Sequence, residues 1–298
     1  MVIEKRARET LTAVEMDVGD ELRFTLASGE VRSMVVKGSS AGVFHTTVDE
    51  PRVEKPGAVT NYRFYGKLSI DGVEVNIGRE VATQRSFYEP REVMGLRLWL
   101  DAVDDIFEFL TEDHGTCRPR KRVRLAVQDA ALGICPVLLH PWCPLPAGGL
   151  RVADCYNGED VWLGAYFGAA AHGGLDINHP AGTPIRAPFA IDDHELYNRV
   201  ERGDNNNRWR GRHRWADGST WILHVCHLVR LRVPEHRPVE AGALLADGAG
   251  VWIRSHEHSH FVFRVVEPGD ADEQSIYLDP WILFRQMYRD RERTTCGL

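Results

Sequence analysis

The chain has 298 residues, of which 43% are hydrophobic and 27% are charged, and its formal net charge is −7 at pH 7. This composition is that of an ordinary globular protein, and the length allows two domains with a sizeable core. A mildly acidic chain lacks the positive charge that is typical of nucleic-acid-binding proteins. The first residues contain no apolar core of a signal peptide, and no stretch approaches the ~20 apolar residues of a membrane span.

Residues 1 to about 90 have the pattern of a small antiparallel β-sandwich or barrel. Segments 21–26 and 31–36 flank a Gly-containing turn, which predicts a hairpin. Segments 67–70 and 73–77 alternate apolar and polar residues and meet at Asp71-Gly72, a strong hairpin signal. No constellation of chemically active residues occurs in this region.

Residues 90 to about 112 predict one long amphipathic helix. Pro90 lies near its start, where a missing backbone N–H is tolerated. Apolar side chains recur at three- and four-residue spacing, which predicts one buried face that packs between two domains. These residues are Leu96, Trp99, Leu100, Val103, Ile106, Phe107 and Leu110.

The predicted domain order is an N-terminal β-domain with its helix (1–115), a connector (116–150) and a C-terminal domain (151–298). The connector is rich in proline and holds a basic run at 118–124, which could bind an anionic polymer but is more typical of a solvated strand face. Residues 208–215 alternate cations with tryptophan, a pattern that can stack bases or sugars. A twisted hairpin with a charged outer face is the favoured interpretation.

Six cysteines are present, and none forms the Cys-x-x-Cys pair of structural zinc sites and redox proteins. Four of them fall between 117 and 155, so a disulfide there is one alternative. Buried or free thiols are the simpler expectation. The six are Cys117, Cys135, Cys143, Cys155, Cys226 and Cys296.

Two histidine-containing segments predict a metal site. In a strand, alternate side chains share a face, so His258 and His260 would point into one pocket about 7 Å apart. One would serve as a ligand, with the other beside it. Upstream, His172 and Asp176 offer a second nitrogen and a hard oxygen, a donor mixture that suits Zn²⁺. Three protein ligands leave a position open for water, which is the arrangement of a catalytic zinc.

His227 is a further candidate for acid–base chemistry. It lies on an apolar strand, where Val225, His227 and Val229 would share one face and His224 and Cys226 the other. A single histidine on such a strand is more often a core residue than a catalytic one.

The region from about 160 to 284 resembles the M23 (LytM/lysostaphin-type) zinc metallopeptidases. Its segments follow the order of the family's motifs. His172-Gly173-Gly174-Leu175-Asp176-Ile177 is similar to H-x-G-x-D-[IF], residues 181–187 to the G-T-P-V-x-A strand, Cys226-His227-Leu228 to Y-x-H-L, residues 239–250 to the V-x-x-G-x-x-I-G-x-x-G turn, His258-Ser259-His260-Phe261 to H-L-H-F, and Leu278-Asp279-Pro280 to the final D-P.

The resemblance implies a mainly β fold in which an antiparallel sheet forms a groove with zinc on its floor. It implies that His172, Asp176 and His260 are the zinc ligands, and that His227 and His258 are catalytic. It also implies hydrolysis of peptide cross-links or bridges in bacterial peptidoglycan, in the cell envelope or outside the cell. Val225 departs from the family pattern, because tyrosine is usual there, and Arg264 stands where an acidic residue often follows.

Two alternatives remain beside a zinc endopeptidase. The first is a non-catalytic zinc-containing module that binds or regulates at the cell wall. The second is a zinc hydrolase of another amide or ester, with the N-terminal domain covering the groove.

Overall fold

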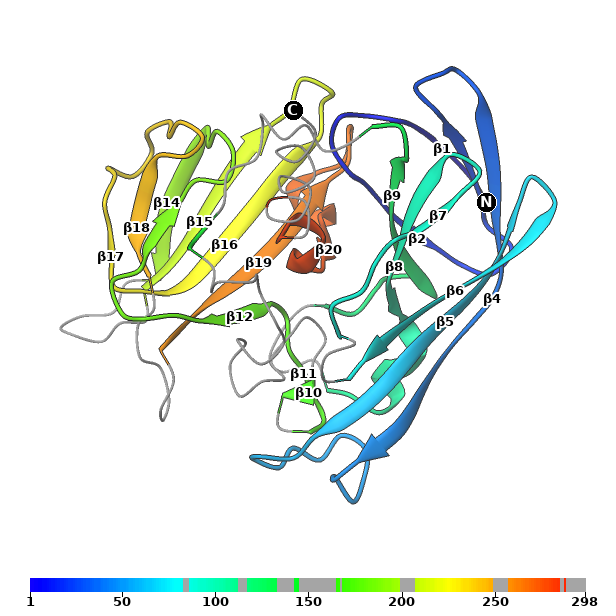
Figure 1. The fold of residues 1–298 in the computed structure, drawn as a ribbon, viewed down its shortest axis with the longest axis horizontal. Coiled ribbons are helices and arrows are strands. Elements are labelled where there is room, and N and C mark those ends of the chain that lie inside the picture. The colour runs from blue at the N-terminus through cyan, green and yellow to red at the C-terminus, as the bar shows by residue number, and fades with distance from the viewer. Residues whose placement is uncertain are drawn as a thin grey trace, which may run out of the picture. The chain divides into compact units, whose positions relative to one another are not determined.

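The structure is a computed structural model that describes residues 1–82, 86–111, 117–132, 142–144, 165–166, 168–198, 207–248, 257–284 and 287. The chain forms two compact units (Figure 1). The first comprises Met1–Gly133 and Leu163–Gly173, and the second comprises Ile134–Trp162 and Gly174–Leu298. Within the described ranges, no helix is long and apolar enough to cross a bilayer.

A five-stranded sheet in the first unit has the order β1-β3-β4-β5-β6. Only the β1–β3 pair is parallel among its neighbours. Its strands are β1 (Val2–Arg6), β3 (Glu21–Thr25), β4 (Val31–Thr46), β5 (Thr60–Ile70) and β6 (Val73–Val81). Both predicted hairpins are confirmed, and the second turns at Asp71 and Gly72 with φ of 49° and 84°. Two positive φ values are what a tight two-residue hairpin requires.

A four-stranded antiparallel sheet with the order β2-β9-β8-β7 completes the first unit's main architecture. Its strands are β2 (Thr12–Met16), β7 (Arg91–Val93), β8 (Leu96–Val103) and β9 (Val123–Asp129). β8 packs against β5 and β6 of the other sheet. β9 falls inside the segment that the sequence predicted to be a connector.

The predicted long helix at 90–112 is wrong. The segment forms β7, β8 and a short 3₁₀ helix, η2 (Asp104–Glu108). Every residue of β8 except Arg97 is buried, so its apolar side chains fill both faces and happen to match helical spacing. Met94 and Gly95 have φ of 50° and 78° and close the β7–β8 hairpin, a turn that the apolar pattern conceals.

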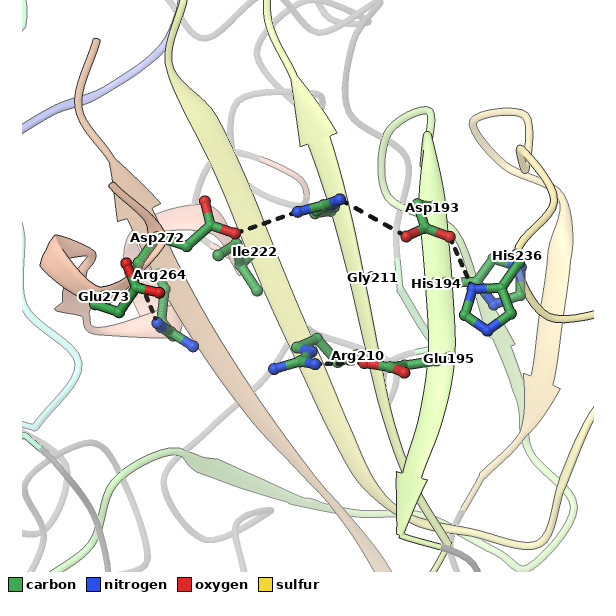
Figure 2. Close-up of a pocket in the computed structure, with 11 residues that line it drawn as sticks. Asp193, His194, Glu195, Arg210, Gly211, Ile222, His236, Arg264, Asp272 and Glu273 are labelled. Carbon is green, nitrogen blue, oxygen red and sulfur yellow. Dashed lines mark hydrogen bonds and ion pairs between the residues drawn. The ribbon is translucent and has the colours of Figure 1, made fainter. Parts of the chain in front are cut away.

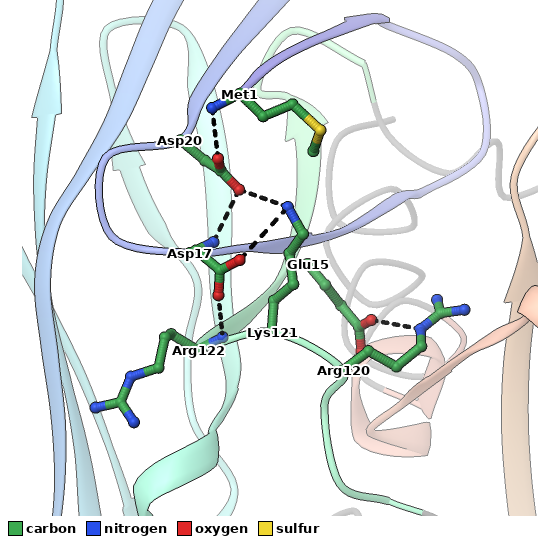
Figure 3. Close-up of polar contacts among 7 residues, drawn as sticks. All are labelled: Met1, Glu15, Asp17, Asp20, Arg120, Lys121 and Arg122. Atoms are coloured by element: carbon green, nitrogen blue, oxygen red, sulfur yellow. Dashed lines mark hydrogen bonds and ion pairs between the residues drawn. The ribbon is translucent and has the colours of Figure 1, made fainter.

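The basic run at 118–124 is engaged in ion pairs within the first unit, and Figure 3 shows those of Arg120 and Lys121. Arg120 Nε donates to Glu15 at 2.8 Å, and Lys121 Nζ donates to Asp20 at 2.5 Å. Arg124 is buried and its Nε lies 2.6 Å from Asp101 Oδ2. Arg118 and Arg122 pair with Asp104 and Asp105. The run is therefore neutralised within its own unit, but the expected solvated strand face is wrong, because only Val123 and Arg124 belong to β9 and both are buried.

The second unit is built on a sheet with the order β12-β19-β16-β15-β14, in which β20 also pairs with β19. All its pairs are antiparallel. Its strands are β12 (Leu175–Asn178), β14 (Asp193–Asn198), β15 (Asn207–Arg214), β16 (Thr220–Leu228), β19 (His258–Val266) and β20 (Ile276–Leu278). A smaller sheet holds β13 (Pro184–Arg186), β18 (Leu244–Asp247) and β17 (Arg230–Leu231). The mainly β prediction is therefore confirmed for the described chain.

The two faces of the large sheet differ in polarity. On one face, Phe261, Phe263 and Val265 of β19 are buried beside the buried Val225 and Leu223 of β16. The opposite face, called the polar face below, carries in each strand the residues that alternate with these. They include Asp176, His258, His260, Arg264, His224, Cys226, Arg210, Arg212, Asp193 and Glu195.

The alternation in β15 follows the favoured interpretation of the Trp/Arg pattern. Trp209 is fully buried, whereas Arg210, Arg212 and Arg214 are exposed. The strand is therefore one arm of a hairpin with a charged outer face.

Candidate metal centre

Asp176 and His260 face each other across the β12–β19 ladder. They are directly paired in register, so both side chains point to the polar face. His260 Nδ1 lies 2.7 Å from Asp176 Oδ1, and the Asp176 side chain is only 6% exposed. An anionic oxygen and an imidazole nitrogen thus share one small, largely dry space.

His172 completes this group. One ligand atom from each of His172, Asp176 and His260 lies within 4.8 Å of the other two. His172 is buried and directly follows β11 (Ala170–Ala171). The three predicted ligands are therefore brought together by one continuous segment and one neighbouring strand.

The first unit holds the segment that leads to His172. Thr111 N–H donates to the Ala169 carbonyl at 2.6 Å, and Ala171 N–H donates to the Thr111 carbonyl at 3.0 Å. The Thr60 hydroxyl donates to the Gly168 carbonyl. A Cβ on Gly168 would lie 2.3 Å from Val48 Cγ2, so the segment fits against this unit without room for a side chain.

The surroundings of Gly174 explain why the His-x-Gly-x-Asp pattern has glycine at this position. A Cβ there would lie 2.4 Å from His260 Cε1 and 2.5 Å from His260 Nε2. It would also lie 2.7 Å from the Phe261 carbonyl oxygen. Only glycine therefore lets the chain pass between His172 and Asp176 while the His260 ring keeps its place.

The donor set fits a zinc ion. Two imidazoles and one carboxylate match the ligand types of catalytic zinc sites, which bind three protein groups and leave one position open. All three groups are close together, and His172 and Asp176 are buried. Because residue 174 is glycine, no side chain enters the space beside the His260 ring.

His227 lies beside the ligand group, and the predicted alternation around it is wrong. Its ring centroid is 4.7 Å from that of His258 and 6.2 Å from that of His260. The residue therefore joins the polar face instead of the Val225 face. Its φ of +62° interrupts the regular alternation of the strand, so the imidazole points to the polar face. Positive φ is uncommon outside glycine and is found at functional sites.

Burial keeps the His227 imidazole neutral. It lowers the pKa of His227 to about 3, with a further contribution from neighbouring His258, although Asp176 acts in the opposite direction. His258 is buried, and its Nε2 lies 3.6 Å from Asp176 Oδ2. His227 is therefore a neutral imidazole at pH 7, able to accept a hydrogen bond or a proton.

His179 and Ser259 form a supporting contact that the sequence did not predict. His179 Nε2 lies 2.9 Å from Ser259 Oγ, and Ser259 is fully buried between His258 and His260 in β19. Burial lowers the pKa of His179 to about 4. This pair fixes the backbone between the two histidines, and only the proximity of His179 to Asp176 in sequence could have indicated it.

Val225 does not supply a polar group to this face. It is buried and pairs with Phe261 in the core. The hydroxyl of Tyr197 in β14 reaches the polar face instead. Tyr197 Oη lies 3.7 Å from Cys226 Sγ, and the Tyr197 ring packs edge to face against the His224 ring. Cys226 is buried with a free thiol, and burial raises its pKa to about 11. Three of the six cysteines lie outside the described residues.

Comparisons with known proteins place this geometry in context. No protein-family model and no curated protein matches the chain. Among solved structures, the peptidase lysostaphin from Staphylococcus simulans matches with 19% identity and a TM-score of 0.30. The chain is similar to M23 peptidases of known structure. The match covers 50% of this chain and 49% of lysostaphin, so it spans about half the length of that protein.

Two further structures match over most of the chain. A putative M23 peptidase from Pseudomonas aeruginosa is 16% identical to this chain and has a TM-score of 0.29. The match covers 93% of this chain and 94% of that protein. A zinc-containing peptidase from Vibrio cholerae is 11% identical to this chain and has a TM-score of 0.30. The match covers 86% of this chain and 81% of that protein.

Proposed function

We propose that the protein is a zinc-dependent endopeptidase that hydrolyses peptide bonds, with peptidoglycan cross-links or bridges as its substrate. The observation that carries this proposal is the convergence of His172, Asp176 and His260 within 4.8 Å, with two further histidines beside them. The order of motifs along the sequence supports the same assignment.

Each residue has a distinct role in the proposed reaction. His172, Asp176 and His260 would hold the metal, and zinc bound there would polarise the peptide carbonyl and lower the pKa of a water molecule. His227, kept neutral by burial, accepts the proton released as the water attacks. His258 faces both His227 and Asp176 and donates to the oxygen that gains negative charge.

A digestion assay tests this function. Purified muropeptides are incubated with the zinc-loaded protein, with His227→Ala, and with His213→Ala as a control on the same sheet. We expect cleavage by the wild type and His213→Ala, and loss of cleavage with retained zinc in His227→Ala. Zinc binding without cleavage of any muropeptide would favour a non-catalytic cell-wall module, and cleavage confined to other amides or esters would favour a different hydrolase.

A further inference from the structure

A charged hollow lies on the polar face of the large sheet (Figure 2), and none of the three candidate ligands lines it. Its volume is about 390 Å³, and it is lined by strands β14, β15, β16 and β19 and by the 3₁₀ helix η5 (Asp272–Gln274). Three arginines and four carboxylates line it, so its ligand must be polar. The lining groups used below are Arg210, Arg212, Arg264, Asp193, Glu195 and Asp272.

Most charges in the hollow are already paired with one another. Arg210 pairs with Glu195, and Arg212 lies 3.2 Å from Asp272 and 3.8 Å from Asp193. Arg264 differs from the other two arginines: within the described part of the chain, no carboxylate lies within ion-pair distance of it. It is also less exposed than Arg210 and Arg212.

The Arg264 guanidinium is held in place by neutral groups. Its Nε donates to Ser275 Oγ at 2.9 Å, and its Nη2 donates to the Asp272 carbonyl at 3.2 Å. Its Cζ lies 5.1 Å from the centroid of the Tyr277 ring. Among the described residues, Nη1 has no partner. A fixed guanidinium with an unused donor is a preorganised receptor for a carboxylate.

A second polar nitrogen lies near Arg264 on the polar face. His224 lies on the polar face, directly opposite Arg210. It pairs with Val262, which lies two residues before Arg264 on the same face of β19. Its Nε2 is buried and has no hydrogen-bond partner among the described residues. A carboxylate beside Arg264 would therefore accept a hydrogen bond from a charged donor. It would also lie near His224 Nε2, which has no hydrogen-bond partner among the described residues.

Strand geometry fixes the distance between this receptor and the candidate metal centre. His260 and Arg264 are four residues apart on the same face of β19, whose register is regular. At ~3.3 Å per residue, their Cα atoms are about 13 Å apart. A peptide lying extended along β19 would therefore place its fourth residue from the cleaved bond over Arg264.

We propose that Arg264 forms a subsite for a carboxylate on the peptide substrate, about four residues from the cleaved bond. This proposal rests on the proposed endopeptidase function. The carboxylate could be the peptide's own terminus or an acidic side chain, and both are compared below.

Equilibrium binding tests the subsite without requiring hydrolysis. Fluorescein-labelled hexaglycine acid and hexaglycine amide are titrated with His227→Ala protein, and Kd is measured from fluorescence anisotropy. A second pair of amides carries Glu or Gln at the penultimate position. We expect the acid or the Glu peptide to bind about tenfold more tightly than its neutral partner. Adding Arg264→Gln should reduce the preference to less than twofold.

Two further variants isolate the charge at this position. Arg264→Lys keeps the charge but loses the fixed guanidinium, and should retain part of the preference. Arg230→Gln removes an arginine of the smaller sheet and should leave the preference unchanged. Equal binding of both members in each pair, no binding of any peptide, or a preference that survives Arg264→Gln would overturn the subsite. Arg264-dependent binding without any hydrolysis by the zinc-loaded wild type would contradict the endopeptidase function and leave the subsite standing.

Discussion

Gly174 lies so close to His260 that a single added carbon at residue 174 would fall 2.4 Å from the imidazole ring. The two residues are far apart in sequence but are brought together by the pairing of β12 with β19. The glycine is therefore part of the geometry of the ligand group, although it offers no ligand atom itself.

Gly174→Ala is expected to displace His260 and weaken zinc binding by about tenfold or more, as the loss of a supporting residue does in other metal sites. Zinc affinity measured by competition with a chromogenic chelator checks this. Gly38→Ala is the control, because a Cβ there meets nothing within 4 Å. Unchanged zinc affinity in Gly174→Ala would contradict the account of the glycine.

The left-handed backbone at His227 makes a separate prediction about strain. Asparagine tolerates positive φ better than most residues. His227→Asn should therefore keep the stability and the zinc content of the wild type, while hydrolysis falls by about 10²–10⁴-fold, as expected on loss of a general base. The thermal unfolding midpoint, zinc content and kcat are measured on the same preparation. Activity within threefold of the wild type would remove His227 from the catalytic group.

Gly168 tests how the first unit holds the chain before His172. A Cβ at this position would lie 2.3 Å from Val48 Cγ2 and 2.6 Å from Ala58 Cβ. We expect Gly168→Ala to lower the free energy of unfolding by about 2 kcal/mol or more, through overpacking and strain at its φ of +79°. It should also lower zinc content, because His172 is only four residues further along.

Gly57→Ala is a matched control for this substitution. Gly57 has the same φ of +79°, but a Cβ there meets nothing within 4 Å. The difference between the two variants, measured by chemical denaturation, isolates the steric part. Equal destabilisation would mean that backbone strain alone explains the effect.

Buried histidines predict a loss of stability in acid. Burial lowers the pKa of His179 to about 4 and that of His224 to about 3, whereas both would be near 6.5 in the unfolded chain. Below pH 6.5 the unfolded chain therefore binds more protons than the folded protein. Stability should be complete above about pH 6.5 and fall as the pH drops towards 4, by up to about 1.4 kcal/mol per pH unit for each histidine.

His179→Gln isolates one of these groups, since the amide can keep a hydrogen bond to Ser259 but does not titrate. The free energy of unfolding is measured by urea denaturation at pH 7.0, 5.5 and 4.5. The variant should lose less stability than the wild type between pH 7.0 and 4.5. An identical slope for both proteins would show that His179 titrates normally in the folded state.

Much of the ligand group could be predicted from the sequence, because it depends on local rules. Strand alternation put His258 and His260 on one face, and ligand chemistry added His172 and Asp176. The turn at Asp71-Gly72 was equally local. What failed depended on context: β8 is buried on both faces, so its apolar spacing also fits a helix.

Other features required the folded backbone. The left-handed backbone of His227 interrupts the alternation in β16, and the sequence Cys226-His227-Leu228 does not predict this conformation. Arg264 could be noticed as an unusual cation, but its neutral partners come from η5, from Ser275 after it and from β20. Such contacts join positions whose pairing the sequence does not specify.

In the proposed site, His172, Asp176 and His260 together hold one zinc ion. The metal content of protein purified without chelator is measured by elemental analysis, with wild type and His172→Ala compared side by side. We expect about one zinc per chain in the wild type and loss of that zinc in the variant. A wild-type protein that holds no zinc, even after zinc is added back, would contradict it.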